Sequence, residues 1–180
     1  NAELLIVGEG EEKARLKSLA RSLGLSDRVD FLGQRAHGDL AEIYNAADAL
    51  ILASSREGWP NVLLEAMACG APVVASDAGG SAEVVAAPAA GLIVKERTPE
   101  AFADALTRVF SATDRAATRR YAQTHSWDNT SDGLSALYEN ILARRNAAAS
   151  VRFGRLARDH AGKPRLIVTV DTEEIFDWSA

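Results

Sequence analysis

The sequence predicts an α/β protein with a doubly wound parallel sheet. From Glu3 to Phe110, apolar runs of strand length alternate with segments whose apolar residues recur at helical spacing. This alternation is typical of parallel sheets that carry helices on both faces. The clearest unit is Ser54 to Val74, which together with the apolar run before it predicts a strand, a loop, a helix and a second strand. Its loop follows the carboxyl end of a buried strand, where ligands bind in open parallel sheets.

The N-terminal part contains two predicted pairs of a strand and a helix. Glu3 to Gly8 is a strand that leads into a helix over Glu11 to Leu23, and Gly24 ends that helix. Val29 to Gly33 is the second strand, and a helix over His37 to Ala47 follows it. The residues expected to face the core from these two helices are Leu16, Leu19, Leu23, Leu40, Ile43 and Tyr44.

The central unit begins with the apolar run Ala47 to Ser54 and ends with the strand Pro72 to Ser76. Pro60 and Asn61 are a helix-start signal, with Asn61 as the expected capping residue. Gly70 supplies the stop signal at the other end of the helix.

The next segment contains a glycine pair. Gly79 and Gly80 permit a tight backbone path, and Ser81 is expected to cap a short helix that contains Glu83. Glu83 has two interpretations that the sequence supports equally. It is either a structural glutamate in the first turn of this helix or a residue that lines a ligand-binding cleft. Gly91 to Val94 is the last predicted strand of the sheet.

The C-terminal part is predicted to be helical. One helix begins near Thr98 and covers Glu100 to Phe110, and further helical sequence extends from Asp114 to Leu142. The residues expected to be buried or to pack on the domain are Phe102, Leu106, Val109, Trp127, Leu134, Leu137, Tyr138 and Ile141.

Composition limits the classes of function. With 180 residues, 47% hydrophobic and 25% charged, the chain is long enough for one domain with a core and short for two. The net charge of −5 and the lack of a basic stripe argue against nucleic acid as a partner. The apolar runs are too short to span a bilayer, and we expect a cytoplasmic protein. Cys69 is the only cysteine, which excludes a disulfide within the chain, and we expect it to be buried.

Two common kinds of ligand site are disfavoured. His37 has no cysteine or second histidine at ligand spacing, so we predict no metal site. Gly8 and Gly10 lack the third glycine of the dinucleotide fingerprint, and Glu9 would repel a phosphate there, which argues against an NAD site.

The start of the central helix predicts an anion site instead. If Asn61 caps this helix, the unpaired amides of its first turn and the positive end of its dipole would favour a phosphate or diphosphate. Glu65 lies about one turn further on, and its side chain leans back toward the same end. Glu57 approaches from the loop. A bound phosphate would then have a carboxylate on each side that can accept hydrogen bonds from sugar hydroxyls. This combination suggests a nucleotide-sugar as the ligand.

The segment EGWPNVLLEAMACGAPVV closely resembles the donor-binding signature of the retaining glycosyltransferases of family 4 (group 1), which have the GT-B fold. The resemblance covers Glu3 to Leu142 and implies the Rossmann-like C-terminal half of a two-domain enzyme. It implies that Glu57, the catalytic residue, lies by the transferred sugar and that Glu65 holds the ribose. The other residues implied to bind the donor are Gly58, Trp59, Pro60, Asn61 and Val62, with Gly33, Gln34 and Arg35 near the base and Gly79, Gly80 and Glu83 along the cleft.

The implied reaction transfers a sugar from a UDP-, GDP- or ADP-sugar with retention at the anomeric carbon, and no metal or other cofactor is expected. The acceptor, a sugar or a lipid-linked sugar, would bind the other domain, and the protein would touch a membrane only peripherally. The family's basic pair that grips the diphosphate precedes Asn1, so this fragment alone is expected to be inactive. A non-catalytic nucleotide-binding module, a nucleotide-sugar epimerase of the same fold and half of an oxidoreductase are the alternatives.

The last residues change in character. After the donor-binding domain (1–142), residues 143–163 are predicted to form a linker or surface helix. Residues 164–180 resemble the opening of a polysaccharide deacetylase-type domain, in which Asp171 would be the base. Thr172 replaces that family's adjacent metal-binding aspartate, and Glu173 is its candidate substitute. A strand added to a sheet edge or to a neighbouring molecule is the alternative.

Overall fold

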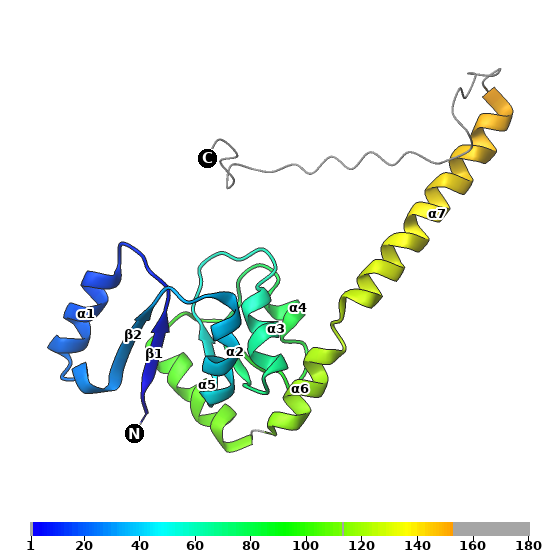
Figure 1. Ribbon diagram of the computed structural model, residues 1–180. Coiled ribbons are helices and arrows are strands. Elements are labelled where there is room, and N and C mark those ends of the chain that lie inside the picture. Colours follow the sequence, from blue (N-terminus) through cyan, green and yellow to red (C-terminus); the bar gives the residue numbers. More distant parts are fainter. Residues whose placement is uncertain (1, 113, 153–180) are drawn as a thin grey trace. The chain divides into compact units, whose positions relative to one another are not determined.

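The computed structural model describes residues 2–112 and 114–152. The chain divides into two units, Asn1–Thr130 and Ser131–Ala180. All the strands in the described residues belong to the first unit (Figure 1). The second unit contributes most of a long helix. The predicted deacetylase-like segment, residues 164–180, lies outside the described residues.

The described strands form two parallel sheets. In one, β1 (Leu4–Val7) pairs with β2 (Val29–Gly33). In the other, β3 (Leu50–Leu52), β4 (Val73–Ser76) and β5 (Gly91–Val94) are ordered β3-β4-β5. The predicted parallel α/β class is confirmed. The described strands do not form the single sheet that the sequence predicted, however, because neither β1 nor β2 pairs with a strand of the β3-β4-β5 sheet.

The helices follow their predicted ranges to within a few residues. The last of them, α7, extends to Arg152, into the segment 143–163 for which a linker or a surface helix was predicted. Their bounds are α1 Lys13–Ser22, α2 His37–Ala46, α3 Asn61–Ala68, α4 Ser81–Val84, α5 Pro99–Ala112, α6 Arg115–Gln123 and α7 Trp127–Arg152, with a 3₁₀ turn at Ser26–Arg28.

Strand β4 lies at the centre of the first unit. All four of its residues are buried. Val73 and Ala75 pack in a cluster with α3, whereas Val74 packs with α5 on the opposite face. Because successive side chains of a strand point to opposite faces, this division shows helices on both sides of the sheet, as the sequence predicted.

Gly91 is required where β4 meets β5. It has a φ of +139°, and a Cβ atom there would lie 1.9 Å from the carbonyl oxygen of Val73. Any larger residue would therefore push the two strands apart.

Helix α3 is the most deeply buried helix of the described chain. Leu63, Ala66 and Met67 have no exposed surface, and Tyr44 of α2 packs into the same cluster. Cys69, which follows α3, is only partly buried, although the sequence predicted that it is buried.

Several side chains of two predicted apolar faces are exposed. On α1, Leu23 is 61% exposed and Leu19 is also exposed. On α7, Trp127 is 79% exposed, and the other exposed residues are Leu134, Leu137, Tyr138 and Ile141. That α7 packs on the domain stays a prediction. Helical spacing identifies the apolar face of a helix but not whether a partner covers it.

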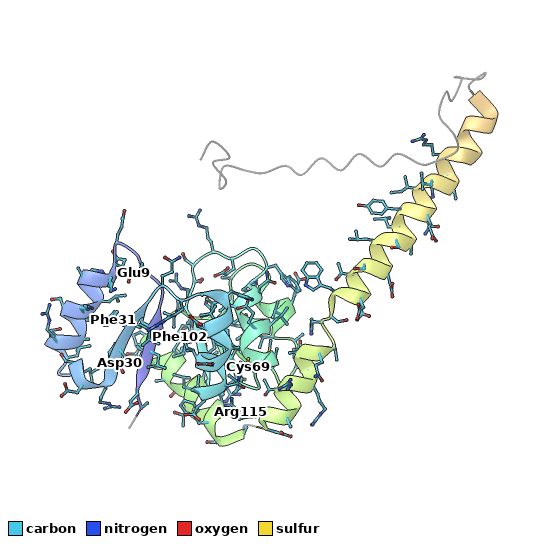
Figure 2. The ribbon with its side chains drawn as sticks, viewed as in Figure 1. Glu9, Asp30, Phe31, Cys69, Phe102 and Arg115 are labelled. Carbon is cyan, nitrogen blue, oxygen red and sulfur yellow. The ribbon has the colours of Figure 1, made fainter. Side chains whose placement is uncertain are left out.

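Arg115, at the start of α6, joins the C-terminal ends of α2 and α3. Its guanidinium donates to the carbonyl oxygens of Ala47 (2.7 Å), Asn45 (3.0 Å) and Cys69 (3.3 Å). Figure 2 labels Arg115 and Cys69 at this end of the unit. A cation at two helix C-termini satisfies carbonyl groups that have no partner within their helices and also compensates both helix dipoles.

Replacing this cation should destabilise the first unit. We expect Arg115→Met to lower the free energy of unfolding by about 3 kcal/mol, because three charge-assisted hydrogen bonds are lost and the carbonyls beneath are left unpaired. Chemical denaturation followed by circular dichroism measures this change. Arg119→Met, at an exposed position of the same helix, should change stability by less than about 0.5 kcal/mol. Equal effects of the two substitutions would contradict the role assigned to Arg115.

Candidate functional site

The predicted site begins with the turn that opens α3. Pro60 is the residue that precedes the helix, and no side chain caps it. The predicted capping role of Asn61 is therefore wrong: Asn61 is the first helical residue, and its amide donates to the carbonyl oxygen of Trp59 at 3.0 Å. The proline carbonyl accepts from the amide of Leu63 at 3.1 Å. The side chain of Asn61 is consequently exposed rather than used within the helix.

The sequence predicted that the first-turn amides are free to bind an anion, but this turn uses some of them. The amides of Asn61 and Leu63 are used in the turn, whereas the amide of Val62 has no acceptor among the described residues. Together with the exposed carboxamide of Asn61 and the helix dipole, it gives α3 an N-terminus suited to a phosphate.

Glu65 lies one turn into α3 and is half-buried. The hydroxyl of Tyr44, on α2, donates to Oε2 of Glu65 at 3.2 Å. Burial first, and then the Glu65 carboxylate, raises the pKa of Tyr44 to about 12. The tyrosine therefore stays a neutral hydrogen-bond donor over the whole physiological range. The sequence placed Tyr44 in the core but missed this bond, because α2 and α3 are brought together only by the fold.

The glycine pair lies directly against the loop that carries Glu57. A Cβ atom on Gly79, whose φ is +51°, would lie 1.8 Å from the carbonyl oxygen of Glu57. The amide of Gly80 donates to the carbonyl oxygen of Gly58 at 2.8 Å, and a Cβ atom on Gly80 would lie 3.0 Å from the ring of Trp59. The structure thus brings together two loops that the sequence assigned to the same cleft.

Two further side chains hold the loop after β3, and the sequence did not single them out. Ser76 is buried at the end of β4, and its hydroxyl donates to the carbonyl oxygens of Ser54 (2.6 Å) and Leu52 (3.3 Å). Arg97 donates to the carbonyl oxygen of Ala53 at 3.2 Å. The loop is therefore fixed at its start by side chains and at its end by the glycine pair.

The residues expected near the base form a separate group. Gly33 has a φ of +70°, and its carbonyl oxygen accepts from the amide of Gly8 at 2.9 Å. A Cβ atom on Gly33 would lie 2.9 Å from Oε1 of Glu9. Gln34 and Arg35 are exposed. Within residues 2–112 the structure gives no hydrogen bond between this group and the loop of Glu57.

Ser81 does not cap α4 as predicted, because Gly80 occupies the position before that helix. The Ser81 hydroxyl is instead fully buried and has no hydrogen-bond partner among the described residues. Glu83 is exposed on α4, so both interpretations of Glu83 stay predictions.

Two cavities of about 290 Å³ each lie away from these loops. One is lined by residues of α1 and β2, including Lys17 and Phe31, and the other by residues of β5 and α5. The described residues contain no cluster of three or more potential metal ligands and no helix long and apolar enough to cross a membrane. The absence of a cofactor stays a prediction.

A parallel α/β domain with a conformationally fixed loop before a buried helix is the arrangement of a nucleotide-binding domain. A sequence model of the family described as glycosyl transferases group 1 matches residues 1–125. The chain therefore belongs to the group 1 glycosyltransferases.

Individual relatives agree with the family. The chain is similar to the D-inositol 3-phosphate glycosyltransferases of Corynebacterium urealyticum (41% identity over 140 residues, covering 74% of this chain and 33% of the relative) and Acidothermus cellulolyticus (37% over 158 residues, covering 83% and 35%). It thus spans about a third of the length of these relatives.

Solved structures support the GT-B, Rossmann-like fold. Sucrose-phosphate synthase from Thermosynechococcus elongatus matches with a TM-score of 0.67 and 32% identity, over 79% of this chain and 39% of that protein. Anabaena HepE in complex with UDP and glucose matches with a TM-score of 0.62 and 28% identity, over 74% and 40%.

A side chain at Gly79 should separate the two loops. We expect Gly79→Ala to lower the free energy of unfolding by more than about 2 kcal/mol, because the new methyl group overlaps the Glu57 carbonyl and φ is positive. Gly58→Ala is the control, since a Cβ atom there has nothing within 4 Å, and its stability should change by less than about 1 kcal/mol. Denaturant titration of both variants measures the difference, and an unaffected Gly79→Ala protein would refute the close approach.

The raised pKa of Tyr44 predicts a loss of stability in alkali. The pKa is about 12 in the folded protein against 10.0 for a free tyrosine. Folding therefore favours the neutral form of Tyr44. The resulting contribution to the unfolding free energy is fully present below pH 10 and is lost as the pH rises from 10 to 12. We expect the unfolding free energy of the wild type to fall by up to about 3 kcal/mol relative to Tyr44→Phe across this window. Parallel pH curves for the two proteins would contradict the assigned environment.

Proposed function

We propose that this chain is the donor-binding half of a retaining glycosyltransferase, which transfers a sugar from a nucleotide diphosphate sugar to an acceptor. The observation that carries the proposal is the contact between the Glu57 loop and the Gly79–Gly80 pair, next to the start of α3. In a member of the group 1 family, this contact supports the catalytic and donor-binding roles assigned by resemblance.

In the proposed complex the diphosphate lies at the N-terminus of α3. The amide of Val62, the side chain of Asn61 and the helix dipole would neutralise its charge, and this stabilisation grows as the diphosphate departs. Gly58, Trp59 and Pro60 would shape the backbone beside it. Glu65 would accept hydrogen bonds from the ribose hydroxyls. Gly33, Gln34 and Arg35 would meet the base.

Glu57 is proposed to lie beside the transferred sugar. The fixed loop would hold its carboxylate near the anomeric carbon, where positive charge develops in the transition state. The departing diphosphate would accept the acceptor's proton on the same face, which gives retention. No protein nucleophile is required, so positioning and electrostatic stabilisation would account for the catalysis.

Partners and setting are proposed on the same basis. HepE binds UDP and glucose, which supports a nucleoside diphosphate and a hexose as ligands here. The acceptor would bind a part of the longer protein outside this chain, and polysaccharide biosynthesis in the cytoplasm is the proposed setting. Gly79, Gly80 and Glu83 would line the same cleft, and no metal is proposed.

The two glutamates should affect different kinetic constants of the full-length protein. We expect Glu65→Gln to weaken nucleoside diphosphate binding about tenfold, because a charged acceptor for the ribose is lost. Glu57→Gln should lower kcat by about 100-fold with little change in that affinity. Calorimetry with UDP, GDP, ADP and NAD, together with sugar-transfer kinetics, separates these effects.

Glu42→Gln, at an exposed position on α2, is the matched control and should change neither constant. Preferential binding of NAD would favour an oxidoreductase half. Sugar transfer by the full-length protein that is unaffected by Glu57→Gln would show a non-catalytic module, and formation of an isomerised nucleotide-sugar without transfer would show an epimerase.

A further inference from the structure

We infer that Tyr44 is a positioning residue that holds the Glu65 carboxylate in the orientation that receives the two ribose hydroxyls. This inference rests on the function proposed above, and it assigns to the pair a selectivity for ribonucleotides over deoxyribonucleotides.

The geometry distinguishes the hydroxyl of Tyr44 from its ring. The ring is buried with Leu63, Ala66 and Met67, a packing role that phenylalanine would fill equally well. The hydroxyl reaches across from α2 and donates to Oε2 of Glu65 at 3.2 Å. It is the only side-chain donor that the described residues present to this carboxylate. The hydroxyl, and not the ring, is therefore the part of Tyr44 that acts on the Glu65 carboxylate.

The direction of the hydrogen bond determines what Glu65 can bind. Because burial and the neighbouring carboxylate raise the pKa of Tyr44 to about 12, the tyrosine keeps its proton and donates, and Oε2 of Glu65 accepts. A carboxylate has about four acceptor sites, so Oε1 and the rest of Oε2 stay available after this bond. Every remaining site accepts, so the matching ligand is a pair of neighbouring O–H donors, which is what the 2′ and 3′ hydroxyls of a ribose provide.

The scaffold beneath the pair is fixed. Arg115 bonds to the carbonyl oxygens of Asn45, which follows Tyr44, and Cys69, which lies one turn after Glu65. The spacing of α2 and α3 is therefore set independently of any ligand. Because Tyr44 holds the Glu65 side chain from this fixed scaffold, the side chain loses less conformational freedom when ribose binds. This preorganisation raises the affinity for the ribonucleotide.

The test compares the full-length wild type and its Tyr44→Phe variant by calorimetry. The probes are UDP, GDP and ADP, and then the 2′,3′-dideoxy form of whichever binds most tightly. We expect the wild type to prefer the ribonucleotide by about tenfold or more and Tyr44→Phe to reduce this preference about threefold to tenfold. Affinity for the dideoxy form should stay within about twofold, because that ligand does not use Glu65.

Tyr121→Phe is the matched control. Its hydroxyl donates to the carbonyl oxygen of Val84 at 2.9 Å and accepts from the amide of Ala86 at 3.2 Å, so the variant also loses tyrosine hydrogen bonds. It should keep the full preference for the ribonucleotide. In transfer kinetics, Tyr44→Phe should raise KM for the nucleotide-sugar and leave kcat unchanged.

The outcomes separate the two hypotheses. If Tyr44→Phe weakens both ligands equally, or changes neither, the positioning role is wrong and the proposed function is unaffected. If the wild type binds none of the nucleoside diphosphates, or does not distinguish ribose from dideoxyribose, the ribose role proposed for Glu65 fails.

Discussion

The position of α3 is the constraint on which the rest of the site depends. Three of its side chains are completely buried against β4 and α2, so the helix cannot shift without opening the core. Arg115 fixes its C-terminal end by bonding to the carbonyl oxygen of Cys69. At the other end, the loop leading into it is bonded to Gly80. With both ends fixed, the first-turn amides and Glu65 keep their positions before any ligand arrives, which is the condition for electrostatic catalysis by fixed dipoles.

The glycine pair connects this helix to the loop of Glu57. The backbone of residues 57–58 lies very close to that of residues 79–80. A Cβ atom on Gly79 would overlap the carbonyl oxygen of Glu57, and one on Gly80 would overlap that of Gly58. The loop is also bonded at its start by Ser76. Glu57 is therefore carried on a backbone held at two points, although it belongs to no helix or strand. The catalytic role proposed for Glu57 requires this kind of support.

The sequence predicted the elements better than the contacts between them. Strand and helix ranges follow from local periodicity and from signals such as Gly70, and these were largely confirmed. The cap assigned to Asn61 was wrong, because a preceding proline shifts the start of the helix by one residue. The roles of Tyr44, Ser76 and Arg115 were missed, because each bonds to residues at least 21 positions away, and no local pattern reports such a bond.

A purely structural role, in which Glu65 only compensates the dipole of α3, does not explain the surroundings of this residue. A glutamate compensates the helix dipole mainly when it lies in the first turn. The first turn of α3 contains no acidic residue, and Glu65 comes after it. Here the side chain is half-buried, and a tyrosine is buried to reach it. A carboxylate has about four acceptor sites, so the bond from Tyr44 leaves others open. Hydroxyl groups of a ligand could occupy these sites, and the donor-binding role proposed for Glu65 depends on them.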